Sequence, residues 1–133
     1  MTPLAFLQGV YYLLTGVWPL VSIGSFQRVT GPKTDLWLVR TVGVLVAVIG
    51  ATLVVSAARR APRRPPGDVA GEPPPMPPEV PVLATASAAG LGAIDTVYAA
   101  RGRIARIYLL DAVLEAGLVA AWLLATRAER RVS

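Results

Sequence analysis

The chain has 133 residues, of which 54% are hydrophobic and only 16% are charged, and its formal net charge is +5. Soluble domains carry about 25% charged residues, so the composition favours a membrane protein, and the length leaves no room for a soluble domain beside several spans. The absence of cysteine and histidine excludes disulfides, thiolate metal sites and the histidine ligands and proton shuttles of many enzymes.

The first apolar run covers residues 4–26 and contains no charged side chain. At about 1.5 Å per residue, a helix of this length crosses a hydrocarbon core of roughly 30 Å. A short polar connection with a Gly-Pro turn signal follows at residues 27–35. The second run, residues 36–57, is interrupted by a single charge, Arg40. These runs predict two spans joined by a short turn.

Residues 58–80 differ in kind, because they hold eight of the twelve prolines and four arginines. This composition predicts a disordered or polyproline-like loop. A third apolar run at residues 81–100 and a fourth at 107–126 are joined by a tight basic turn. The sequence therefore predicts one all-α domain over residues 1–133, an integral membrane four-helix bundle with short outer turns and one long loop.

The distribution of cations predicts the orientation. Seven cations lie in the long loop and the C-terminal tail: Arg59, Arg60, Arg63, Arg64, Arg127, Arg130 and Arg131. Five lie on the opposite side: Arg28, Lys33, Arg101, Arg103 and Arg106. Because cytoplasmic loops carry the excess of Lys and Arg, we expect both termini in the cytoplasm. The richness in Arg, Ala, Gly, Pro and Val resembles a GC-rich bacterial coding pattern, so the expected location is a bacterial inner membrane.

Four ionisable residues lie inside the predicted spans: Arg40, Asp95, Asp111 and Glu115. Such residues are costly in a bilayer and require a partner or a function. Asp95 and Asp111 each lie about five residues from the same turn, and Glu115 lies one helical turn deeper. We expect the Arg40 guanidinium to hold one carboxylate. Glu115, the deepest acid, is the candidate for the group that stays or becomes protonated.

Helical phase gives each span one stripe of small or polar residues. The stripes are Gln8, Tyr11, Thr15, Trp18 and Ser22; Arg40, Gly43, Ala47, Gly50 and Val54; Ala84, Ala88, Gly92, Asp95 and Ala99; and Asp111, Glu115, Leu118 and Trp122. Small residues allow helices to approach closely in a membrane, so these stripes predict the interior of the bundle.

Two interpretations of the charged cluster remain open. In one, an interhelical salt bridge with neutral acids around it holds the bundle together. In the other, which we favour, Arg40, Asp95, Asp111 and Glu115 form a site for a ligand, an ion or a proton. Residues on the polar face of the first span then either pack or touch the ligand: Tyr11, Thr15 and Trp18.

Catalytic motifs are absent from the sequence: it contains no GxGxxG, P-loop, GxSxG or HExxH pattern. We therefore predict no enzyme activity, no catalytic residue, no metal and no cofactor. The pI of about 10.4 would suit nucleic-acid binding, but no binding motif accompanies it. The arginines flank apolar runs instead, where lipid is the expected partner.

The stretch WPLVSIGSFQRVTGPKTDLWLVRTVG, from Trp18 to Gly43, resembles small bacterial four-span membrane proteins, broadly of the DoxX-like kind. The resemblance covers size, span number and layout, and it implies no activity and no site. Small multidrug transporters share the size and span number but carry a carboxylate on the first helix, which this chain lacks. Two functions are predicted as alternatives: a non-enzymatic ligand-binding or accessory module, which we favour, or a proton-coupled transporter acting as a homodimer.

Overall fold

The structure is a computed structural model and describes residues 1–60 and 76–132. Over this part of the chain it is entirely helical, which confirms the predicted all-α class. The helices are α1 (Thr2–Val21), α2 (Ile23–Thr30), α3 (Leu36–Ala58), α4 (Glu79–Ala100) and α5 (Tyr108–Val132). All except α2 are long and apolar enough to cross a membrane. Most of the loop predicted at residues 58–80 lies at 61–75, outside the described residues.

The first predicted span, residues 4–26, is divided into two helices. Helix α1 ends at Val21 and Ser22 leaves helical geometry at φ −144° and ψ 80°. Pro19 lies one turn earlier, where its missing N–H weakens the helix. The connection predicted at residues 27–35 therefore begins only after α2, which ends at Thr30. Gly31 follows with φ 85°, a conformation that glycine adopts without strain.

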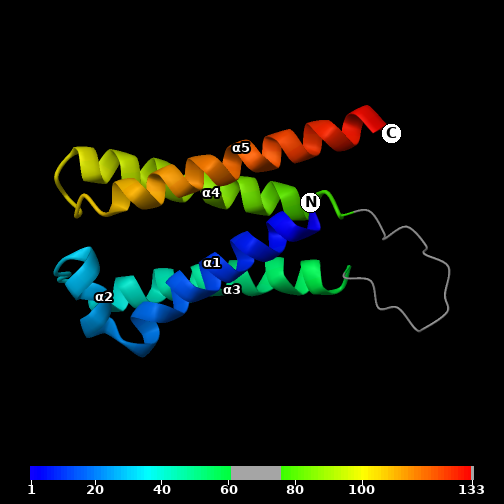
Figure 1. The fold of residues 1–133 in the computed structure, drawn as a ribbon. Coiled ribbons are helices and arrows are strands. Elements are labelled where there is room, and N and C mark those ends of the chain that lie inside the picture. The colour runs from blue at the N-terminus through cyan, green and yellow to red at the C-terminus, as the bar shows by residue number, and fades with distance from the viewer. Residues whose placement is uncertain (61–75, 133) are drawn as a thin grey trace.

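The four long helices form two pairs (Figure 1). Helix α1 packs along α3, and α4 packs along α5. Helix α1 also contacts α2, α4 and α5, and α3 contacts α4, so both helices of the first pair contact the second pair. Apolar side chains from all four long helices meet in one core near the N-terminal end of α1: Ala5, Leu53, Ala57, Val80, Ala84 and Trp122.

Glycines bring the backbones of α1 and α3 into direct contact. A Cβ atom on Gly16 would lie 2.6 Å from the Gly43 carbonyl oxygen, and one on Gly50 would lie 2.6 Å from the Leu13 amide nitrogen. Real Cβ contacts are essentially never this short. The small-residue stripe predicted for the second span is therefore confirmed at Gly43, Ala47 and Gly50, and it faces α1.

Candidate functional site

Two neighbouring tyrosines of α1 donate hydrogen bonds to two acids of α5. The Tyr12 hydroxyl donates to Glu115 Oε2 over 2.8 Å, and the Tyr11 hydroxyl donates to Asp111 Oδ1. The acids are four residues apart, so both project from one face of α5. Glu115 is only 1% exposed and Tyr12 is fully buried. The contact between α1 and α5 is thus built on two carboxyl groups held by neutral donors.

The third acid, Asp95, approaches the same cluster from α4. It is 7% exposed, and its carboxylate accepts no hydrogen bond within the described part of the chain. Asp95 and Asp111 both interact electrostatically with Glu115. Gly92, one turn before Asp95, gives Glu115 its space, because a Cβ there would lie 3.1 Å from the Glu115 Cβ atom. The structure therefore places Asp95, Asp111 and Glu115 near one another.

The predicted role of Arg40 is wrong. Its side chain is exposed, and within residues 1–60 and 76–132 it pairs with none of the three carboxylates. The reason lies in the packing: α3 turns its small-residue face to α1, and α1 supplies the side chains that reach the acids. Arg40 precedes Gly43 by one turn near the start of α3, where a long guanidinium side chain can keep its head solvated.

Two further candidates also lie apart from the acids. The Thr15 hydroxyl donates back to the Tyr11 carbonyl oxygen of its own helix over 2.9 Å. Trp18 is 37% exposed, and its Nε1 atom donates to Ser25 Oγ at the junction of α1 and α2 over 2.8 Å. Of the seven predicted site residues, the structure therefore brings four together: Tyr11, Asp95, Asp111 and Glu115.

Tyr12 was not among the predicted site residues, although it contacts the deepest acid. Gln8, one turn before it, is fully buried and makes two interhelical hydrogen bonds. Its Nε2 atom donates to the Ala84 carbonyl oxygen over 2.9 Å, and its Oε1 atom accepts from Trp122 Nε1 over 2.6 Å. The spacing of four residues between Gln8 and Tyr12 could have placed Tyr12 on the same polar face of α1 as Gln8.

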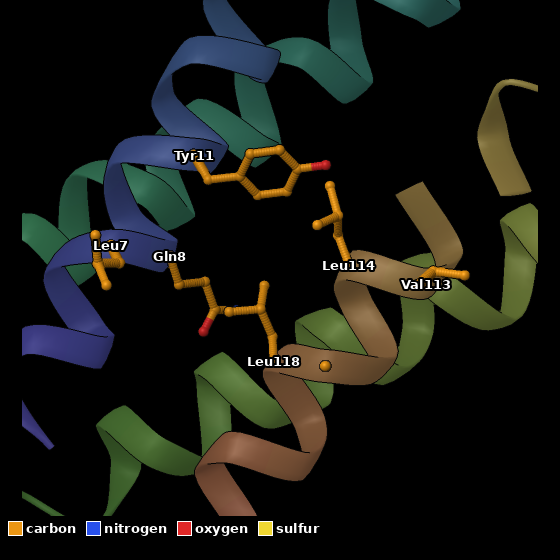
Figure 2. A pocket seen from close by; sticks show the side chains of 7 residues that line it. Leu7, Gln8, Tyr11, Val113, Leu114 and Leu118 are labelled. Atoms are coloured by element: carbon orange, nitrogen blue, oxygen red, sulfur yellow. The ribbon is translucent and has the colours of Figure 1, made fainter. Parts of the chain in front are cut away.

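An apolar groove of about 390 Å³ lies between α1 and α5. It is lined by Leu7, Gln8, Tyr11, Val113, Leu114, Gly117 and Leu118. Figure 2 shows Tyr11 and Gln8 entering it from α1, opposite Leu114 and Leu118 of α5. No atom lies within 4 Å of a Cβ built on Gly117. The groove is therefore open at Gly117 and carries, at Tyr11, the hydroxyl that binds Asp111.

The arrangement of the acids does not suit a metal ion. Among the described residues, no three His, Cys, Asp or Glu side chains are close enough to form a metal site. Asp111 and Glu115 project from α5 and accept from the phenols of α1, whereas Asp95 comes from α4.

Comparison of the chain with protein-family models, with curated proteins and with solved structures finds no match. The interpretation of the site therefore rests on its own residues and geometry.

Proposed function

We propose that the protein is integral to a bacterial inner membrane, which its four long helices cross with both termini in the cytoplasm. Large apolar side chains on outward faces support this placement, among them Leu45 and Val48 of α3 and Leu124 of α5, which are 58%, 58% and 65% exposed. In water such extensive apolar faces would promote aggregation, whereas in a bilayer they contact lipid.

The lack of cysteine gives a direct test of orientation. Thr34→Cys lies in the α2–α3 connection and Ala128→Cys lies near the end of α5. In intact cells a membrane-impermeant maleimide is expected to label the first variant and not the second. The opposite pattern would show the reverse orientation.

Within the membrane, the protein serves as a non-enzymatic binding module for a small molecule, either alone or as an accessory subunit of another membrane protein. The observation that carries this proposal is the apolar groove beside the Tyr11–Asp111 hydrogen bond. Small-molecule sites are mostly apolar concavities with a few convergent polar groups that fix the orientation of the ligand. The groove has this composition, and one of its polar groups, the Tyr11 hydroxyl, contacts the half-buried Asp111.

Labelling with a neutral photoreactive aryl diazirine tests the groove. We expect saturable labelling of the α1 and α5 segments that line it, with loss of saturable labelling in Gly117→Leu, whose side chain fills the open space. Gly90→Leu is the matched control, because a Cβ at Gly90 also meets nothing within 4 Å but lies on exposed α4 surface. Equal, non-saturable labelling of all three proteins would contradict a binding groove.

A second function, proton-coupled transport by a homodimer, is favoured by the burial of Glu115 beside two other acids. Intramembrane carboxylates of this kind act as proton relays in transporters. Transport predicts pH-dependent flux in proteoliposomes that Glu115→Gln abolishes. A binding module predicts saturable binding without flux, so the two functions are separable in one preparation.

A further inference from the structure

Charge balance in the acidic cluster is incomplete. The partners of Asp111 and Glu115 are the neutral phenols of Tyr11 and Tyr12. Asp95 is more than nine-tenths buried and has no hydrogen-bond partner among residues 1–60 and 76–132. No lysine or arginine of these residues pairs with any of the three acids. Buried acids without a cation are strongly unfavourable unless protons or a positively charged ligand compensate them.

The positions of the three acids favour one kind of cation over another. The described acids do not converge into a metal site, and a metal ion would require several oxygen ligands at short distance. An organic ammonium requires only one or two acceptor oxygens, because each of its N–H groups forms a separate hydrogen bond. The cluster therefore suits an amine better than a metal ion.

The position of Asp111 links the cluster to the groove. Its Oδ1 atom accepts from Tyr11, while its Oδ2 atom has no hydrogen-bond partner in the described chain. Asp111 lies one turn before Leu114 on α5, and both Tyr11 and Leu114 line the groove. A ligand in the groove can thus place a donor at the polar end while its body stays between leucines.

The apolar residues that line the groove indicate the chemistry of the rest of the ligand. Leu7, Val113, Leu114 and Leu118 supply apolar surface, and Gly117 leaves space between them. Such a surface accommodates a hydrocarbon tail, as apolar small-molecule sites do. We propose that the ligand of this groove is an amphiphilic amine, with its ammonium at Asp111 and an apolar tail along Leu114 and Leu118.

This inference rests on the proposed function, because it names the ligand class of the same groove. The test compares decylamine with decanol, which share an apolar tail but differ in charge. Binding is measured by calorimetry in nanodiscs of zwitterionic lipid, after subtraction of empty nanodiscs. The proteins are the wild type, Asp111→Asn, Gly117→Leu and the control Gly90→Leu. Asparagine keeps the shape of the aspartate and an oxygen for Tyr11, so thermal stability checks that the variant is folded.

We expect decylamine to bind the wild type and Gly90→Leu at least about tenfold more tightly than decanol, the scale of a hydrogen bond to a charged group. Asp111→Asn should remove this preference by weakening the binding of decylamine to about that of decanol, and Gly117→Leu should weaken the binding of both ligands.

Equal binding of the two ligands by the wild type, with loss in Gly117→Leu, would overturn the amine proposal and leave the groove intact. An amine preference that survives in Asp111→Asn would overturn the assignment of the ammonium to Asp111. Failure of both ligands to bind in a Gly117-dependent manner would overturn the proposed binding function itself.

Discussion

Helix α1 has two interfaces that differ in construction. Toward α3 it presents glycines, and the two backbones touch without intervening side chains. Toward α4 and α5 it presents Gln8, Tyr11 and Tyr12, and each contact is a hydrogen bond between side chains or to a carbonyl oxygen. Close packing of small residues stabilises helix pairs in lipid, whereas buried acids are energetically unfavourable there.

Only the second interface has the features that the proposed binding function requires. The α1–α3 contact leaves no space for a ligand or for an added atom. The α1–α5 contact contains a groove, an open glycine and carboxyl groups without a cation. Natural proteins keep such locally unfavourable arrangements where function requires them. The following variants challenge this division, in order of decreasing effect on stability.

Gly50→Ala tests the first interface. Its Cβ atom would lie 2.6 Å from the Leu13 nitrogen and 2.7 Å from the Gly9 carbonyl oxygen, and backbone atoms cannot move aside without shifting the helix. We expect the free energy of unfolding in detergent to fall by about 3 kcal/mol, the upper range for overpacking. Gly90→Ala is the control and should change little. A loss below about 1 kcal/mol would show that the two helices separate easily.

Gln8→Leu tests the polar bridge of the second interface. The substitution leaves the buried indole N–H of Trp122 without its acceptor, so we expect a loss of about 2 kcal/mol in the free energy of unfolding. In the double variant with Trp122→Phe the orphaned donor is absent, and the combined loss should be smaller than the sum of the single losses. Strict additivity would mean that the bridge does not act as a unit.

Glu115→Gln distinguishes a structural acid from a functional one. The amide oxygen can still accept from Tyr12, while the ionisable group beside Asp95 and Asp111 is removed. We expect stability to rise by about 1 kcal/mol, as for other sites held in an unfavourable state for function. Tyr12→Phe, which removes only the donor, should lower stability by about 0.6 kcal/mol. A sharp loss in Glu115→Gln would make the carboxylate part of the structural framework.

Gly117→Ala is expected to have the smallest effect. Because its Cβ atom would meet nothing within 4 Å, the free energy of unfolding should change by no more than about 0.5 kcal/mol. The comparison is Gly92→Ala, whose Cβ atom would lie 3.1 Å from that of Glu115 and must displace it. If Gly117→Ala lowers the free energy of unfolding in detergent more than Gly92→Ala does, the groove is not open at Gly117.

Much of the helical framework was predictable, because long apolar runs and proline-rich breaks are local properties of the chain. The small-residue stripe of the third span was also predictable from phase, and Ala84, Ala88, Asp95 and Ala99 are indeed buried. The break at Ser22 was not predicted, since residues 4–26 contain no charge and were interpreted as one apolar span. Pro19 was a local signal for a helix break, but the high apolar content of the run favoured a single span.

The site was predictable only in part. Periodicity placed Asp111 and Glu115 on one face of α5 and gave α4 an inward acid, since these are relations within single helices or across a short turn. The pairing of Arg40 with an acid failed, because opposite charge indicates which groups can pair and gives no information on which helices adjoin. The structure assigns the position opposite the acids to the tyrosines of α1.

The sequence by itself predicted that the chain is helical, that four segments are long and apolar enough to span a membrane, and that Asp95 and Asp111 lie at one level with Glu115 one helical turn deeper. Tertiary structure alone decided that α3 pairs with α1, which removes Arg40 from the acids and brings Tyr11 and Tyr12 to them. The physical reason is that composition and periodicity act within one helix, whereas the choice of neighbour depends on how closely two surfaces fit, and here the glycines of α1 and α3 fit each other.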